Sequence, residues 1–217
     1  MTSITENPIL FLVSILVLLF SIILHEVAHG WAAERLGDPT ARMAGRITFN
    51  PLPHIDLFGT VILPISLILL HSSFVIGWAK PVPVNFYRLR RPRRDTILVS
   101  LAGILSNLTL AILISLVWRL VLLFELQPGT IFFFFANVVY YTVGINLLLA
   151  VFNLVPVPPL DGSKVVGALL PPRWEAVLFN PQFSLIGTFV LFALLWTGLL
   201  WRILGPVLVF LQNILLS

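Results

Sequence analysis

The chain has 217 residues, of which 59% are hydrophobic and only 10% are charged. A soluble domain carries roughly a quarter of its residues as Asp, Glu, Lys and Arg, so this composition excludes a soluble globular protein and indicates a multi-pass membrane protein. Cysteine is absent, which excludes disulfide scaffolds, thiolate zinc sites and a cysteine nucleophile. The net charge of +4 is small and comes mostly from one loop, so we attribute it to membrane topology and expect no nucleic-acid partner.

The uncharged stretches predict the membrane spans, because a spanning helix needs about 20 apolar residues. Four crossings are predicted, at residues 8–30, 96–123, 130–155 and 183–201. The first helix should continue to about Leu36, with Gly37 as its C-terminal cap. For two other apolar runs, 57–79 and 203–217, the sequence does not decide whether they cross the membrane. We therefore expect an all-α polytopic membrane protein with about five to six membrane-embedded helical segments, in which residues 1–217 form a single membrane-embedded domain.

The end of the first predicted span carries the clearest chemical signal, because residues 25–29 read His-Glu-Val-Ala-His. Residues four apart on a helix lie on one face, so His25 and His29 can bind one Zn²⁺ ion. Glu26 then lies beside the metal, where it can accept a proton from water. The alternative is a helix whose polar end merely reaches the membrane interface. Ionisable groups at the end of an apolar helix are costly and usually functional, which favours the zinc site.

Two histidines leave the site one ligand short, because catalytic zinc usually has three protein ligands and a water molecule. Asp161 is one candidate, since it is the only carboxylate between Glu125 and Glu175. His54 and Asp56 are the others. These two could instead contact the ligands, provide an inhibitory ligand, or form a polar turn after two prolines.

The loop at residues 80–95 contains one lysine and five arginines but a single aspartate. The positive-inside rule predicts that this loop is cytoplasmic, which puts Asp161 near the cytoplasmic face after two further crossings. If Asp161 shares a zinc ion with the first span, both flanks of residues 57–79 are cytoplasmic. About 23 residues cannot cross twice, so this segment must dip and return, or cross and come back through an extended stretch at residues 77–84.

Three motifs together resemble those of the site-2 proteases, zinc metalloproteases that cut peptide bonds within the membrane. They are the H-E-x-x-H sequence, a Gly-x-x-x-Asn element at residues 103–107, and an Asn-x-x-Pro-x-Pro-x-Leu-Asp-Gly element at residues 153–162. The resemblance implies one zinc ion per chain, with Asp161 as the third ligand and Glu26 as the general base. It also implies that Asn107 and Asn153 lie near the site, although an asparagine in an apolar span is more often a helix-packing group.

The resemblance further implies an intramembrane zinc endopeptidase whose substrate is the transmembrane segment of another protein in a bacterial or archaeal cell membrane. The chain has no room for the PDZ or CBS domains that some relatives carry, so a separate regulatory membrane protein is a possible partner in the lipid bilayer. The alternative is a non-proteolytic scaffold or transporter that retains a zinc site. Glu26 distinguishes the two, because hydrolysis needs this base in addition to the ligands.

Overall fold

The computed structural model describes residues 7–70, 77–123, 129–171 and 180–217, and the regular secondary structure in these ranges is helical. Four helices are long and apolar enough to cross a membrane: α1 (Pro8–Arg35), α4 (Pro92–Leu123), α5 (Thr130–Asn153) and α9 (Leu199–Leu216). The shorter helices are α2 (Thr40–Met43), α3 (Leu63–Leu69), α6 (Asp161–Leu169) and α8 (Pro181–Trp196). The protein is therefore an all-α, multi-pass membrane protein, as its composition predicts.

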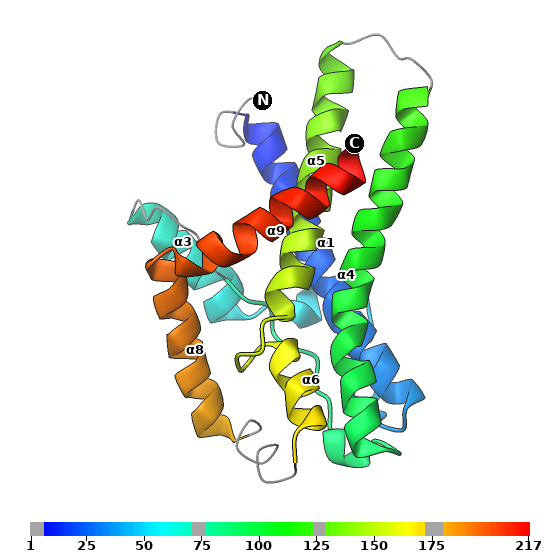
Figure 1. The fold of residues 1–217 in the computed structure, drawn as a ribbon, viewed down its shortest axis with the longest axis vertical. Helices are drawn as coiled ribbons and strands as arrows, with labels where there is room; N and C mark the ends of the chain where they lie inside the picture. Colours follow the sequence, from blue (N-terminus) through cyan, green and yellow to red (C-terminus); the bar gives the residue numbers. More distant parts are fainter. Residues whose placement is uncertain (1–6, 71–76, 124–128, 172–179) are drawn as a thin grey trace.

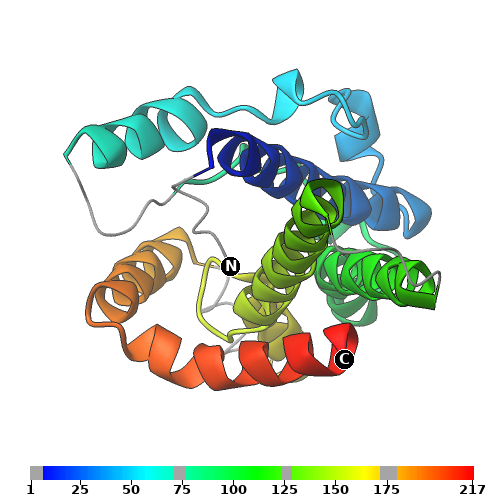
Figure 2. The same cartoon turned by 90° about the horizontal axis from the view of Figure 1, so that it is seen from above.

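Helices α1, α4 and α5 pack against one another and form the centre of the molecule (Figures 1 and 2). A buried apolar seam between α4 and α5 consists of Ala111, Val139, Val143 and Leu147. The small side chain of Ala111 lets the two helices approach closely at this seam, which favours association within a membrane. The exposed leucines, isoleucines and phenylalanines on the outer surfaces of these helices suit contact with lipid.

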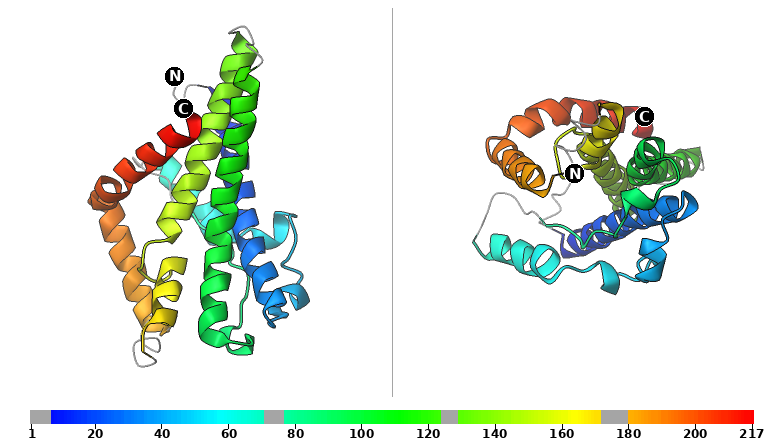
Figure 3. Two further views of the ribbon diagram at one scale, coloured as in Figure 1. Left: turned by 45° about the vertical axis from the view of Figure 1, so that its right-hand side comes forward. Right: turned by 90° about the horizontal axis from the view of Figure 1, so that it is seen from below.

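Helices α1 and α5 run in one direction through the bundle, and α4 runs in the other (Figures 1 and 3). The end of α1, the start of α4 and the end of α5 consequently lie at the same end of the bundle. Helix α6 follows at that end and packs against α4, and Arg93 donates a hydrogen bond to the carbonyl oxygen of Leu170 just beyond α6. This arrangement brings the start of α6 close to the second half of α1.

The boundaries of α1 follow its sequence. The Asn7 side chain accepts hydrogen bonds from the backbone N–H groups of Ile9 and Leu10, at 3.0 and 3.2 Å, and so caps the helix start. The helix ends at Arg35, and Gly37 has a φ of 115°, which suits a residue that follows a helix end. The predicted end near Leu36 is confirmed.

The predicted crossing at residues 183–201 is wrong, because the chain turns within it. Helix α8 ends at Trp196, and Gly198 adopts a left-handed conformation with a φ of 70°, which residues other than glycine rarely adopt. The turn leaves α8 with 16 residues and gives α9 18 residues. The candidate span is therefore α9, which includes most of the 203–217 run that the sequence left open.

Within the apolar run at 57–79, the helical residues that the structure describes are 57–69, which are too few to cross the membrane alone. A π-helical turn at Leu57–Ile62 leads into α3, and the chain after the undescribed residues 71–76 is non-helical from 77 to 85. The N–H of Trp78 donates to the carbonyl oxygen of Gly59 at 3.1 Å, and the N–H of Lys80 donates to that of His54 at 2.9 Å. The chain after α3 thus lies beside the chain that enters it.

Because the end of α1 and the start of α4 lie at the same end of the bundle, their positions can be tested by cysteine labelling. We expect Met43→Cys and Tyr87→Cys to be labelled by an impermeant maleimide from one face of the membrane, and Ile131→Cys from the opposite face. The three native side chains are exposed by 76%, 97% and 86% respectively, and the native chain contains no cysteine. The unsubstituted protein is the control, and labelling of positions 43 and 87 from opposite faces would contradict the arrangement.

Candidate metal centre

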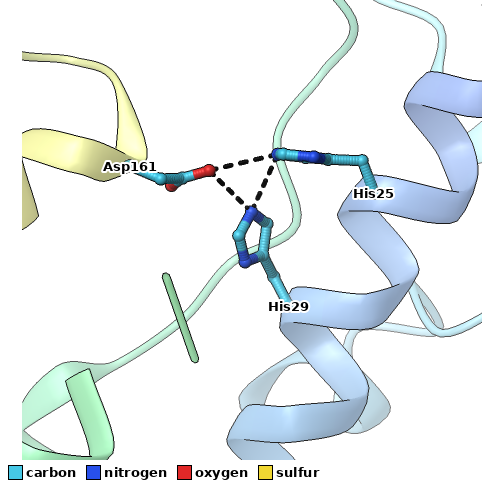
Figure 4. A group of neighbouring side chains, drawn as sticks. All are labelled: His25, His29 and Asp161. Atoms are coloured by element: carbon cyan, nitrogen blue, oxygen red, sulfur yellow. Dashed lines mark hydrogen bonds and ion pairs between the residues drawn. The ribbon is translucent and has the colours of Figure 1, made fainter. Parts of the chain in front are cut away.

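His25, His29 and Asp161 converge on one point at the interface of α1 and α6 (Figure 4). The Nε2 atoms of the two histidines lie 3.1 and 3.0 Å from the same oxygen, Oδ2 of Asp161, and 3.0 Å from each other. All three side chains are buried. Among the residues that the structure describes, they form the group of His, Asp and Glu side chains that could hold a metal ion.

The orientation of the imidazoles suits metal binding. Nδ1 of His29 lies 2.7 Å from the carbonyl oxygen of Val99, on α4. A backbone carbonyl can only accept, so Nδ1 carries the proton and Nε2 presents a lone pair. Nδ1 of His25 lies 3.0 Å from Oδ1 of Asn107, also on α4. Such hydrogen bonds behind the ligating nitrogen are typical of metal-binding histidines.

The distances also fit zinc. In a tetrahedral zinc site with bonds of about 2.0–2.1 Å, neighbouring ligand atoms lie about 3.3 Å apart, close to the 3.0–3.1 Å between these three atoms. Two nitrogen lone pairs and a carboxylate oxygen at this separation repel one another unless a cation lies between them. The donor set therefore fits a zinc ion, with a fourth position left for water or substrate.

Gly103 of α4 provides the space for the two imidazoles. A Cβ atom at this position would lie 2.5 Å from Nε2 of His29 and 2.7 Å from Cε1 of His25. Atoms in contact cannot approach so closely, and both rings are held from behind by α4. The glycine of the predicted Gly-x-x-x-Asn element is thus explained by close packing, and its asparagine is the Asn107 that contacts His25.

Asp161 uses its two oxygens differently. The ammonium of Lys164 donates to Oδ1 at 2.8 Å, while Oδ2 faces the histidines. Burial alone would raise the pKa of the Asp161 carboxyl, and the Lys164 ammonium beside Oδ1 counters this by favouring the charged carboxylate. Lys164 was not among the residues predicted for the site, although its spacing of three residues from Asp161 on a helix is a signal for this contact.

Glu26 lies beside the centre and has a backbone partner. Its Oε2 accepts a hydrogen bond of 2.6 Å from the N–H of Val82, in the non-helical segment 77–85. Glu26 and this segment line a cavity of about 450 Å³ that also reaches the three converging side chains, Asn153 and Lys164. The contact with Val82 could not be predicted from local sequence patterns, because it joins segments 56 residues apart.

The other candidates lie outside the centre. His54 is fully buried, and its Nε2 lies 2.9 Å from the carbonyl oxygen of Thr48. Asp56 accepts a hydrogen bond from the N–H of Gly59 at 2.7 Å and caps the turn that follows. Neither residue lines the cavity, so of the three candidates for the third ligand, the structure brings Asp161 to the histidine pair.

The close approach of the two imidazoles to Gly103 can be tested by substituting this glycine. We expect Gly103→Ala to weaken zinc binding at least 10-fold, the lower end of the effect typical for changes around metal ligands, because the new methyl group displaces the imidazoles. Zinc affinity is measured on purified protein by competition with a chromophoric chelator. Gly205→Ala in α9 is the matched control, since its Cβ would meet no atom within 4 Å. Equal zinc affinity in the two variants would show that the imidazoles do not occupy this position.

Comparison with known proteins agrees with this geometry. The sequence profile of Peptidase family M50 matches residues 119–198. The chain is 35% identical to the candidate zinc metalloprotease YwhC of Bacillus subtilis, over 88% of this chain and 85% of that protein.

More distant relatives come from other organisms. The candidate zinc metalloprotease Rip2 of Mycobacterium tuberculosis is 33% identical over 80% of this chain, which spans only 64% of Rip2. The candidate zinc metalloprotease MJ0611 of Methanocaldococcus jannaschii is 27% identical over 87% of this chain and 83% of its own. No solved structure gives a significant match. Together with the buried centre, these relationships show that the chain is a zinc metalloprotease and belongs to peptidase family M50, the site-2 protease family.

Proposed function

We propose that the protein is an intramembrane endopeptidase that cuts within or next to the transmembrane segment of another membrane protein. In this proposal His25, His29 and Asp161 bind one zinc ion and Glu26 is the general base. The observation that carries it is the Glu26 carboxylate, which lies in one cavity with the converging ligand atoms among apolar helices long enough to span a membrane. Structural or transported zinc would need the ligands but not this carboxylate.

Different residues around the centre have different roles in the proposed hydrolysis. Zinc bound at the centre would act as a Lewis acid on the scissile carbonyl and on the attacking water. Glu26 takes the proton from that water and passes it to the nitrogen of the leaving amine. The hydrogen bond from Val82 holds Oε2 of Glu26 in place, so Oε1 is the proposed proton acceptor. Lys164 occupies Oδ1 of Asp161, which leaves a single oxygen for the metal.

The substrate must reach the cavity in an extended form. A helical transmembrane segment hides its carbonyl groups in backbone hydrogen bonds, so it has to unwind before attack. The cavity walls support an extended ligand, because they include Pro81 and Val82 of the non-helical segment 77–85 and Pro159 of the loop before α6. Non-helical backbone at membrane depth is stable only where protein or a water-filled cavity covers it, and hydrolysis requires such water.

The proposed site lies nearer the cytoplasmic face. Val99 and Gly103, which contact or face the histidines, belong to the first turns of α4, directly after the basic loop that the positive-inside rule assigns to the cytoplasm. The return of residues 78–80 to residues 54–59 supports a re-entrant path for the segment between them. Relatives from bacteria and an archaeon support a location in such a cell membrane, and a separate membrane protein remains the proposed regulator.

The role of Glu26 is tested by Glu26→Gln. We expect this variant to retain zinc near the wild-type level, because Glu26 is not a ligand, and to lose about 10²–10⁴-fold in cleavage rate, the typical contribution of a positioned general base. Candidate single-pass membrane proteins, tagged at both ends, are co-expressed with each variant and their fragments quantified by immunoblotting.

Glu34→Gln is the matched control for this experiment. Glu34 lies on the same helix but pairs with Arg42 at 2.8 Å, away from the cavity, so its substitution should leave cleavage unchanged. Wild-type cleavage by Glu26→Gln would exclude Glu26 as the base.

A further inference from the structure

We infer that Asn146, on α5, is a positioning residue that determines which ring nitrogen of His25 carries the proton, and that it acts through Asn107 on α4. The inference rests on the proposed function, since it concerns the same metal centre. It assigns a purpose to a buried polar chain that links three apolar helices: Ser21 on α1, Asn107 and Asn146.

This series of hydrogen bonds begins at a backbone carbonyl oxygen, which can accept a hydrogen bond but cannot donate one. Nδ2 of Asn146 lies 2.9 Å from the backbone carbonyl oxygen of Thr142, one turn earlier on α5. A carbonyl oxygen has no proton to donate, so the end of the amide that faces it must be the NH₂ group. The same NH₂ group donates to Oγ of Ser21 at 2.9 Å. The opposite end of the Asn146 amide, which faces Asn107, is therefore its oxygen.

The orientation of Asn146 determines that of Asn107. Because Asn146 presents Oδ1, the group of Asn107 that lies 3.2 Å from it must be a donor, Nδ2. Nδ2 of Asn107 also lies 3.5 Å from the carbonyl oxygen of Ser21, a second acceptor that favours the same orientation. Oδ1 of Asn107 then faces Nδ1 of His25 at 3.0 Å. An amide oxygen can only accept, so Nδ1 of His25 carries the proton and Nε2 presents its lone pair to the metal.

The hydrogen bonds from Asn146 through Asn107 to His25, here called the relay, are needed at His25 but have no counterpart at His29. His29 hydrogen-bonds a backbone carbonyl, which cannot reverse its polarity. His25 hydrogen-bonds a side-chain amide, which has a donor end and an acceptor end of nearly equal shape and would serve the wrong tautomer if it turned over. Asn146 removes that ambiguity.

Burial gives the relay its strength. Ser21, Asn107 and Asn146 are each 0% exposed, so no solvent can satisfy a reversed amide. Turning Asn107 over would set NH₂ against the protonated Nδ1 of His25 and oxygen against the oxygen of Asn146. Buried polar groups left without a partner are costly, so the native orientation is strongly preferred.

The test measures zinc affinity without any substrate, by competition with a chromophoric chelator on the purified protein. We expect Asn146→Leu to weaken zinc binding 10- to 100-fold, as is typical when a partner of a ligating histidine is lost. The decisive variant is the double substitution Asn107→Asp with Asn146→Leu. A carboxylate presents an acceptor to His25 whichever way it turns, so this substitution should restore zinc affinity to within a few-fold of the wild type.

Ser115→Ala is the matched control for simple loss of packing. Ser115 is also a buried polar residue on α4, and its hydroxyl donates to the carbonyl oxygen of Leu215 on α9, away from the cavity. Its substitution should lower the melting temperature and leave zinc affinity unchanged. A purely structural role for Asn146 would give the same pattern.

Three results would overturn the inference. The first is wild-type zinc affinity in Asn146→Leu. The second is a double variant that does not recover zinc affinity although Asn107→Asp alone binds zinc normally. The third applies if Asn146→Leu does not fold, and is wild-type zinc affinity in Asn107→Leu. None of these depends on cleavage. Failure of the relay is thus distinguishable from failure of the proposed function, in which Glu26→Gln would bind zinc normally and still cut.

Discussion

The structure depends on one contact, in which Oδ2 of Asp161 faces the Nε2 atoms of His25 and His29 at 3.0–3.1 Å. These groups come from helices that are more than 130 residues apart in the chain, and all three side chains are buried in a molecule with lipid-facing surfaces. A buried carboxylate is costly unless it is paired. Lys164 provides one partner for Asp161, and a zinc ion bound between the three side chains would provide the other. The packing of α6 against α4 brings Asp161 close to the histidines.

Helix α4 acts as the template for this contact. Along about two turns it offers the Val99 carbonyl to His29, the bare backbone of Gly103 to both rings, and the Asn107 amide to His25. The two histidines on α1 are thus oriented by a neighbouring helix and not by their own. A rigid helix holds such a set of groups more accurately than a loop can.

The histidine pair could be predicted from the sequence because helical periodicity alone places residues i and i+4 on one face. Asp161 was a candidate because few carboxylates exist in such an apolar chain. The resemblance to the site-2 proteases then selected it over His54 and Asp56. The all-α class and three of the four predicted crossings follow from the apolar runs that α1, α4 and α5 contain.

The remaining features depend on tertiary packing. Gly198 lies in an uncharged run, and glycine is common within membrane helices, so the sequence does not reveal that the chain turns there. The contact between Val82 and Glu26, and the chain from Asn146 to His25, join helices and segments whose relative placement periodicity cannot determine. An asparagine on an apolar helix predicts a hydrogen bond to a neighbour but not the neighbour's identity.

The most direct test of the account is the zinc content of purified Asp161→Ala and Asp56→Ala, measured by atomic emission after dialysis. The account predicts about one zinc ion per chain in the wild type and in Asp56→Ala, because Asp56 only caps a turn. Asp161→Ala should lose the metal, since two histidines alone hold zinc poorly. Full zinc occupancy in Asp161→Ala together with its loss in Asp56→Ala would contradict the centre described here.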